Sequence, residues 1–335
     1  MLKIALVGYG YWGQVLLTKF QELNPRLVKK VVDIRSKRLD IVRKQYSHIA
    51  VATTIEPLLN DKEIDAVVIA TPAHSHFKLA KKALLAGKHV LVEKPMTTSV
   101  REAEELIRLS KKRSRVLMVD HTVLYTKAVQ KLKKLINNNV LGNIKYFDAT
   151  RINLGLFQSD INVLWDLAAH DLAVLQHLID ERPYSVQAIG ISHDKKGIEN
   201  IGYLSLRYKS GMIAHFNCSW ISPVKIRLTL IGGDKKMIVF NDIEPTEKIK
   251  IYNKGYHISS DSTDKQMLVN YRIGDVLIPK LEINDAVIDM IKDFINAIKN
   301  KRKPVSNSQL SLSIVKILDF AQRSIAKRGK EIAIP

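Results

Sequence analysis

Short apolar strands alternate with helical segments through the first 120 or so residues of this chain. Strand-like runs occur at residues 3–7, 28–34, 49–53, 66–70, 90–93 and 116–119, and segments with helical spacing separate most of them. The run at 66–70, AVVIA, contains no polar residue, as is typical of a strand buried on both faces. Repeated β-α-β units of this kind predict a parallel, doubly wound sheet.

A glycine-rich turn follows the first strand and opens the first helix. Residues 8–13 read GYGYWG, a complete G-x-G-x-x-G motif in the strand–turn–helix context that the motif needs. Gly8 can form the tight turn, Gly10 lets the backbone approach a pyrophosphate, and Gly13 lets the helix pack on the sheet. Free N–H groups at the helix start attract phosphates. The motif predicts a dinucleotide site, to which we expect Tyr11 and Trp12 to contribute.

An acidic residue stands at the end of the second strand. Asp33 lies 20 residues after Gly13, where a carboxylate can accept hydrogen bonds from an adenosine ribose. This favours NAD, because a carboxylate repels the 2′-phosphate of NADP. Ile34 and Arg35 adjoin this position, and the charges of Arg35 and Lys37 could offset the repulsion, so NADP stays open. No tyrosine has a lysine four residues later, which argues against a short-chain dehydrogenase.

The pattern changes after about residue 121. Helices are expected at 126–138 and 163–179, a strand at 144–153, strands without intervening helices from 185 to 251, and two final helices at 286–299 and 308–327. Strands that no helix separates pair mostly antiparallel. We therefore expect an α/β protein of two domains. Residues 1–121 form a Rossmann domain for NAD(P), and residues 122–335 form an α+β domain on an open, mostly antiparallel or mixed sheet for substrate binding and oligomerisation.

Composition narrows the class of partner. The net charge is +20, but it is spread along the chain, and the two basic clusters at 111–115 and 299–303 fall at expected helix ends, where cations complement the helix dipole. Because no zinc-finger, basic-zipper or RNP pattern occurs, we expect anionic small molecules rather than nucleic acid as partners. No apolar run is long enough to span a bilayer, and no signal-peptide cleavage site follows the N-terminus. Cys218 is the only cysteine, so the expected location is the cytoplasm, without membrane association.

Three groups of polar residues are candidates for the chemistry. Lys94 follows a buried strand, at the edge of an open α/β sheet where ligands bind and where its amine can hydrogen-bond a reacting hydroxyl. Asp166 and His170 are spaced i, i+4 in the expected helix 163–179, so both side chains share one face. An imidazole can accept a proton near neutral pH, and Asp166 can orient it or bind a sugar hydroxyl. The alternative interpretations are that Lys94 is an ordinary surface lysine and that Asp166 and His170 belong to a polar stripe on a helix surface.

The third group follows the strand at 66–70 and comprises Thr71, Pro72 and His76. Its place after a sheet strand puts it over the same edge of the sheet, although His76 is equally compatible with a helix start that satisfies local backbone groups. With one cysteine and no His-Glu-x-x-His sequence, we expect no metal site.

Four segments together resemble the Gfo/Idh/MocA oxidoreductase family: GYGYWG at 8–13, ATPAHSH at 70–76, AGKHVLVEKP at 86–95 and WDLAAHDL at 165–172. The resemblance covers essentially the whole chain, and the Glu-Lys-Pro strand end with the later Asp-x-x-x-His is its specific part. It implies a Rossmann domain followed by an α/β domain whose open sheet often joins subunits, here in a homodimer or homotetramer. It also implies an enzyme that transfers a hydride between a sugar carbon and NAD or NADP.

The resemblance implies a role for each matching residue. Lys94 would lie beside the substrate hydroxyl, and His170 would accept or donate the proton with Asp166 as its partner. The nicotinamide side would be lined by Thr71, Pro72, His76 and Glu93. Ala169 stands where similar members often have proline, a position without a chemical role.

The substrate is suggested by residues 216–242 and 244–252, which look like those of members acting on nucleotide-activated sugars, UDP-N-acetylglucosamine 3-dehydrogenases in particular. The residues available to contact such a substrate are Arg151, Asn153, Lys225 and Arg227. Solvated strand faces explain these side chains equally well. The alternatives are an NADPH-dependent ketoreductase, a dehydrogenase of inositol or free sugars, and a non-catalytic NAD(P)-binding protein.

Overall fold

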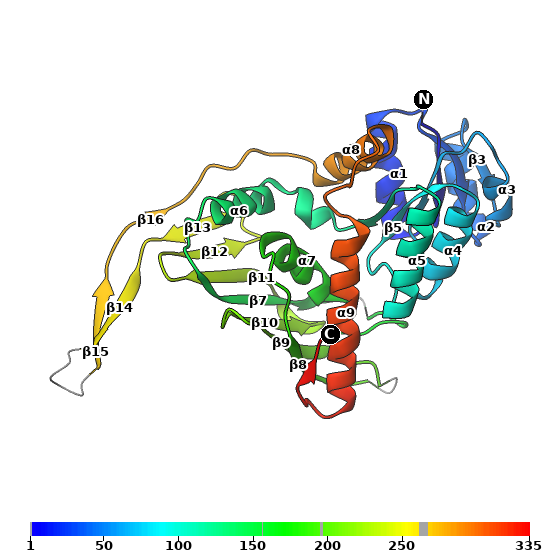
Figure 1. The fold of residues 1–335 in the computed structure, drawn as a ribbon. Coiled ribbons are helices and arrows are strands. Elements are labelled where there is room, and N and C mark those ends of the chain that lie inside the picture. Colours follow the sequence, from blue (N-terminus) through cyan, green and yellow to red (C-terminus); the bar gives the residue numbers. More distant parts are fainter. Residues whose placement is uncertain (1, 156, 195–196, 261–266) are drawn as a thin grey trace. The chain divides into compact units, whose positions relative to one another are not determined.

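The computed structural model describes residues 2–155, 157–194, 197–260 and 267–335 (Figure 1). By their contacts the residues form two compact units. The first comprises Met1–Thr126 and Asn284–Asp319, and the second comprises Lys127–Ile283 and Phe320–Pro335. The chain thus leaves the first unit after Thr126 and returns to it at Asn284. The sequence pattern suggested two consecutive domains, and the return of 284–319 departs from that division.

The first unit is built on a sheet of six parallel strands in the order β3-β2-β1-β4-β5-β6. Its strands are β1 (Ile4–Val7), β2 (Val28–Val32), β3 (Ala50–Ala52), β4 (Ala66–Ile69), β5 (His89–Glu93) and β6 (Leu117–Asp120). The strand order reverses between β1 and β4, which is the Rossmann arrangement and places a ligand crevice at the carboxyl ends of these two strands. The predicted doubly wound parallel sheet is confirmed.

Helices connect these strands, and two late segments of the chain join them. The elements are α1 (Tyr11–Leu23), α2 (Ser36–Gln45), α3 (Glu56–Leu59), α4 (Ala73–Leu85), α5 (Val100–Lys112), the 3₁₀ turn η1 (Thr122–Tyr125), α8 (Ala286–Lys299) and the first part of α9 (Ser308–Ala326). Helix α8 packs against α1 and η1. Asp285 caps α8 by accepting from the backbone N–H groups of Val287 and Ile288, and Lys19 of α1 lies 3.0 Å from its carboxylate. The cap and ion pair fix where the returning chain joins the first unit.

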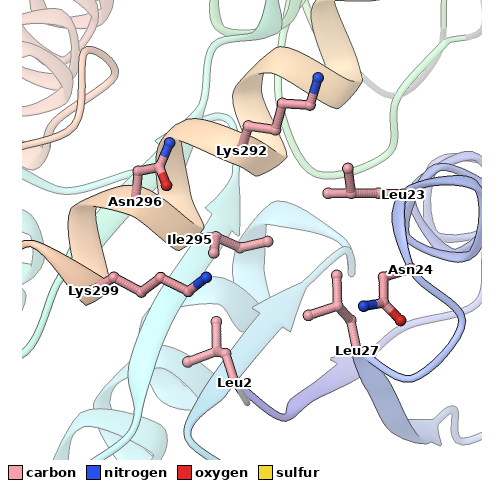
Figure 2. A pocket seen from close by; sticks show the side chains of 8 residues that line it. All are labelled: Leu2, Leu23, Asn24, Leu27, Lys292, Ile295, Asn296 and Lys299. Carbon is pink, nitrogen blue, oxygen red and sulfur yellow. The ribbon is translucent and has the colours of Figure 1, made fainter.

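A groove of about 320 Å³ lies beside the contact of α1 with α8 (Figure 2). Leucines line one side of it and α8 the other, with two lysine amines at its rim; the lining residues are Leu2, Leu23, Asn24, Leu27, Lys292, Ile295, Asn296 and Lys299. Leu2 and Leu27 lie within two residues before β1 and β2, so the groove is at the amino ends of these strands. It is therefore at the opposite edge of the sheet from the glycine turn.

The second unit contains a mixed sheet of nine strands in the order β16-β13-β12-β11-β7-β10-β9-β8-β17. Its strands are β7 (Ile144–Leu154), β8 (Ser185–Ile191), β9 (Ile201–Arg207), β10 (Ile213–Ser219), β11 (Ile221–Gly233), β12 (Met237–Asn241), β13 (Ile249–Tyr252), β16 (Val276–Leu277) and β17 (Ile332–Ala333). Strands β7 and β10 pair parallel, and the other described pairings in this sheet are antiparallel. The predicted mixed, mostly antiparallel sheet is confirmed. Strands β14 (Gly255–Ser260) and β15 (Met267–Arg272) form a separate hairpin.

Helices of the second unit are α6 (Lys127–Asn137) and α7 (Ala169–Leu178), and α7 continues a π-helical turn, η2 (Leu164–Ala168). Side chains of β8, β9 and β10 alternate between the core and the outer face. The inner face buries Val186, Ala188, Leu204, Leu206, Ala214 and Phe216, whereas the outer face exposes Ile189, Ile191, Tyr203 and Ile213. Within the described residues, no helix combines the length and the hydropathy needed to cross a membrane.

Candidate active site

The glycine turn lies at the reversal point between β1 and β4. Gly8 has a φ of +96°, and a Cβ on it would lie 2.3 Å from the carbonyl oxygen of Ala70. A Cβ on Gly13 would lie 2.1 Å from the carbonyl oxygen of Gly8. Both positions therefore require glycine. A Cβ on Gly10 would instead meet nothing closer than the Arg38 guanidinium at 3.7 Å, so the backbone at Gly10 has room on the side where a diphosphate would approach.

Asp33 is held at the end of β2 by three donors. Its Oδ2 accepts from the backbone N–H of Tyr9 at 2.7 Å, and its Oδ1 accepts from the backbone N–H of Arg35 at 2.8 Å. The Arg38 guanidinium lies 3.1 Å from Oδ2. Arg38 thus stands between Asp33 and Gly10. Sequence reasoning considered Arg35 and Lys37 and missed Arg38, although its place in the first turn of α2 was a usable signal.

Two large apolar side chains flank this region. The side chains of Tyr11 and Ile34 are 83% and 87% exposed, which is unusual for residues of this size. Tyr11 begins α1 and Ile34 follows Asp33, so both flank the backbone groups just described. The exposed Tyr11 and Ile34 side chains and the space at Gly10 suit a bound dinucleotide, whose rings would cover these apolar side chains.

A buried histidine holds the loop that follows β4. His76 is 1% exposed, and its two ring nitrogens lie 2.7 Å from the carbonyl oxygen of Thr71 and 2.8 Å from that of Pro95. Thr71 also hydrogen-bonds Ser75 at 2.6 Å through its hydroxyl, and Pro72 is exposed beside it. These contacts of His76 are to backbone, so it joins the loops that follow β4 and β5. Direct contact of His76 with a cofactor stays a prediction.

The ends of β5 and β6 place two carboxyl groups side by side. Glu93 and Asp120 pair directly in the parallel register of these strands. Asp120 accepts from the indole N–H of Trp12 at 2.8 Å and from the backbone N–H of Thr122 at 3.0 Å, and the Thr122 hydroxyl donates to it as well. Burial raises the pKa of Glu93 well above its ordinary value, and the neighbouring Asp120 raises it further. Sequence reasoning missed Asp120 because nothing local links it to Trp12.

Lys94, half-buried, follows Glu93, and its charge acts on both Glu93 and His121. His121 is 2% exposed and its Nε2 lies 3.1 Å from the Ser311 hydroxyl. Burial lowers the pKa of His121 to about 4, so this imidazole is neutral at physiological pH. Lys94 thus lies near two groups whose neutral forms are favoured by burial.

In the second unit, Asp166 and His170 lie on the same helical stretch but in different geometries. Asp166 belongs to the π-helical turn η2, and His170 lies in the first turn of α7. The predicted i, i+4 relation of a regular α-helix therefore does not hold over the whole interval. The Asp166 carboxylate accepts from the indole N–H of Trp220 at 3.0 Å, and both predicted residues are half-buried. Single π turns interrupt helices frequently at functional sites.

One suggested substrate contact is corrected by the structure. Arg151 is 5% exposed, and its guanidinium donates to the carboxylate of Asp171 through two hydrogen bonds of 2.7 Å each. Burial alone would lower the pKa of Arg151, but the charge and hydrogen bonds of Asp171 raise it, so the arginine stays ionised. The pair joins β7 to α7, and Arg151 belongs neither to a solvated strand face nor to an open binding surface.

The other suggested contacts lie on β7 and β11. Arg227 lies 3.5 Å from Asp242, whereas Lys225 is exposed and Asn153 is half-buried. Lys225 is thus exposed, whereas Arg227 has an acidic partner, and contact of either side chain with a substrate stays a prediction. Among the residues that the structure describes, no three His, Cys, Asp or Glu side chains come together in a way that could hold a metal ion.

Comparison with known proteins assigns both units. Residues 2–121 match the model described as "Oxidoreductase family, NAD-binding Rossmann fold", and residues 129–239 match the one described as "GFO/IDH/MocA C-terminal domain". The chain belongs to the Gfo/Idh/MocA family. It is therefore an oxidoreductase with an NAD-binding Rossmann domain, as the sequence pattern predicted.

Individual relatives differ in how much of the chain they match. The uncharacterized oxidoreductase YdgJ of Escherichia coli (strain K12) is 36% identical over 148 residues, which are 44% of this chain and only 42% of that protein. UDP-N-acetylglucosamine 3-dehydrogenase of Acidithiobacillus ferrooxidans is 26% identical over 314 residues, 90% of each chain.

Two solved structures share the fold over nearly the whole length. That of the Acidithiobacillus ferrooxidans enzyme has a TM-score of 0.81 at 23% identity and covers 97% of this chain and 98% of the other. Levoglucosan dehydrogenase in complex with NADH and levoglucosan has a TM-score of 0.82 at 20% identity, covering 100% and 99%.

Proposed function

We propose that this protein is an NAD-dependent dehydrogenase that transfers a hydride between a hydroxyl-bearing carbon of a nucleotide sugar and the nicotinamide ring. The observation that carries the proposal is the gathering of the glycine turn, Asp33, Thr71 and Lys94 at the carboxyl edge of one parallel sheet. Ligands of open α/β sheets bind at that edge. The likeness to UDP-N-acetylglucosamine 3-dehydrogenase over 90% of both chains supports a nucleotide sugar as substrate.

The residues of the chain have distinct parts in this reaction. NAD, when bound, supplies the hydride acceptor. The backbone N–H groups at the start of α1 hold its diphosphate, and Asp33 accepts hydrogen bonds from its ribose. Lys94 hydrogen-bonds the substrate hydroxyl, and His170 accepts the proton that this hydroxyl loses. Asp166, itself held by Trp220, acts as the partner of the imidazole.

Replacing Lys94 by Met tests the proposed chemistry. Because methionine keeps the length of the side chain but cannot hydrogen-bond the hydroxyl, we expect turnover to fall by about 100-fold or more. The affinity for NADH should change by less than about threefold, since the N–H groups of the glycine turn remain. Nicotinamide absorbance measures turnover on a panel of UDP-sugars, free sugars and inositols, and NADH fluorescence measures binding. Lost NADH binding with unchanged turnover per bound cofactor would contradict the role of Lys94.

Replacing His170 by Asn tests the proton acceptor. A base must be deprotonated to act, so kcat/KM of the wild-type enzyme should fall as the pH is lowered through the pKa of that base. The amide side chain that H170N introduces does not titrate, so the acidic limb should disappear and turnover should be about 100-fold lower. A pH profile of unchanged shape would remove His170 from the reaction. NADH binding without turnover by the wild-type protein on any sugar would favour a non-catalytic role, and turnover that needs NADPH and a keto-sugar would favour a ketoreductase.

We also propose a homo-oligomer joined through the outer face of β8, β9 and β10. This face exposes Ile189, Ile191, Tyr203 and Ile213, and a groove of about 420 Å³ crosses it. Contiguous apolar surface on a soluble protein commonly marks an interface. The cytoplasm remains the proposed location, because the one cysteine, Cys218, is buried and can form no intrachain disulfide.

A further inference from the structure

We propose that Glu93 and Asp120 hold a single proton between them, with Glu93 protonated and Asp120 ionised, and that Asp120 is a positioning residue that fixes the first turn of α1 for the cofactor diphosphate. This inference rests on the proposed function, because it assigns to the pair a part in holding NAD. Beyond the proposed function, it assigns a role to Asp120 and a protonation state to the carboxyl pair at the edge of the sheet where the cofactor would bind.

The strand register places the two groups next to each other. Glu93 and Asp120 are the last residues of β5 and β6 and are partners in the parallel register, so their side chains project from the same face of neighbouring strands. The Glu93 carboxyl group is therefore a direct neighbour of the Asp120 carboxyl group at the end of the sheet. If two such neighbours share a proton, only the protonated one can donate to the other, because a carboxylate has no hydrogen to donate. Adjacent carboxyls that both ionised would also repel each other.

The surrounding donors decide which group is charged. Asp120 is 4% exposed and accepts from the Trp12 indole, the Thr122 backbone and the Thr122 hydroxyl. Three donors stabilise an ionised carboxylate. The Oε1 atom of Glu93, in contrast, is buried without a hydrogen-bond partner among the described residues. An oxygen without a donor suits the neutral acid, which places the proton on Glu93.

Other ionisable groups near the pair do not reverse this order. Lys94 favours the ionised form of Glu93, but burial and Asp120 act more strongly in the opposite direction. His121 contributes no charge at neutral pH, because burial lowers its pKa to about 4. Burial is the largest cause that raises the pKa of Tyr125, and the charge of Asp120 raises it as well. The Tyr125 hydroxyl therefore stays neutral.

The Trp12 contact is what connects the pair to the cofactor. Trp12 lies between Gly10 and Gly13, in the first turn of α1, whose N–H groups face the diphosphate. A hydrogen bond from a neutral donor to a carboxylate is about twice as strong as one between neutral groups. Asp120 thus ties the start of α1 to the end of β6. A neutral Glu93 avoids a second negative charge at the edge where an anionic cofactor binds.

The test compares two isosteric variants, E93Q and D120N. Glutamine resembles a protonated glutamate, whereas asparagine resembles the form that Asp120 does not adopt. We expect D120N to weaken NADH binding by about tenfold or more, as for the loss of a hydrogen bond to a charged group, and E93Q to weaken it less than D120N does. Glu63→Gln and Asp40→Asn are the matched controls, because both carboxylates are exposed and lie away from the carboxyl edge of β5 and β6.

The indole N–H signal of Trp12, assigned by its loss in Trp12→Phe, provides a second reading without cofactor. It should lie downfield in the wild-type protein and in E93Q, and it should move upfield in D120N, because the charged acceptor is gone. Equal losses of NADH affinity in the two variants, or a larger loss in E93Q, would overturn the assignment of the proton. Failure of the wild-type protein to bind NADH would instead refute the proposed function, and the indole signals would still decide the charge state of the pair.

Discussion

Asp33 and Arg38 have opposite effects on the choice between NAD and NADP at the proposed adenosine site. The carboxylate of Asp33 suits the free ribose hydroxyls of NAD and repels a 2′-phosphate. The guanidinium of Arg38, 3.1 Å from this carboxylate, is the kind of group that binds a phosphate. While Asp33 is present, the two charges offset each other. The proposed preference for NAD over NADP therefore depends on the Asp33 side chain, whose removal would leave the Arg38 cation behind.

We predict that Asp33→Ser raises the ratio of NADPH to NADH affinity by about tenfold or more, since it removes the repulsion and releases Arg38 for a phosphate. Adding Arg38→Gln should remove that gain. Fluorescence titration with both cofactors measures it, and Lys37→Gln in the same background is the matched control, because Lys37 is exposed on the same helix. If K37Q cancels the gain as fully as R38Q, Arg38 is not the selecting residue.

Single residues show where sequence reasoning succeeds and where it ends. The conformations of Gly8 and Gly13 followed from the motif, because the motif is a local arrangement of turn and helix. Arg151 was expected either to contact substrate or to lie on a solvated strand face. Its partner Asp171 lies 20 residues away on α7, and only the packed fold brings the two together. The Trp12–Asp120 hydrogen bond joins residues 108 apart and was invisible for the same reason.

At the scale of elements, a titratable group lies where the end of β6 contacts residues 284–319, the segment that returns to the first unit. His121 follows β6, and its Nε2 lies 3.1 Å from the hydroxyl of Ser311 in α9. The backbone N–H of Val119 also donates to the carbonyl oxygen of Ser306 at 3.1 Å. A buried neutral imidazole in such a junction makes the junction sensitive to acid.

We predict that His121 makes folding stability fall between about pH 6.5 and pH 4. Burial lowers its pKa in the folded state to about 4, below the ordinary value of about 6.5, so only the unfolded chain binds the proton in this range. The contribution is complete above pH 6.5, decreases by about 1.4 kcal/mol per pH unit on acidification, and levels off near the folded pKa. Urea unfolding of the wild type and His121→Asn at several pH values measures the difference.

The wild type should lose more stability than H121N between pH 7 and pH 4. His89 has a folded pKa of about 4 as well, so both proteins retain a common acid dependence, and the comparison isolates His121. Parallel curves for the two proteins would show that His121 is not the responsible group.

Element positions were largely predictable because they depend on local periodicity. The strands of the first sheet, α6, α8 and α9 lie within a few residues of the expected bounds. The π turn at Leu164–Ala168 was not predicted, because one inserted residue per turn leaves no mark on the apolar pattern of a buried helix. The hairpin of β14 and β15 also escaped prediction; in the described part of the chain these two strands pair with each other and join neither larger sheet.

At the scale of the whole molecule, we predict that Ile189→Glu dissociates the proposed oligomer, because it places a charge in apolar surface between subunits. Light scattering coupled to gel filtration should show the mass falling to that of one chain, with an unchanged circular dichroism spectrum. Ile41→Glu on α2 is the matched control, since Ile41 is 42% exposed and Ile189 is 54% exposed. A wild-type protein that elutes as a single chain would refute the proposed oligomer outright.

The return of residues 284–319 to the first unit has a consequence for biosynthesis. Helix α8 brings Met290, Ile291 and Phe294, all 0% exposed, into that unit, so a nascent chain that has emerged only to Thr126 lacks them. The ribosome must translate the whole intervening unit before these side chains arrive. An expression fragment that stops near residue 126 should therefore aggregate or bind chaperones, whereas one that rejoins residue 126 to 284 through a short flexible linker should yield a Rossmann unit that folds by itself.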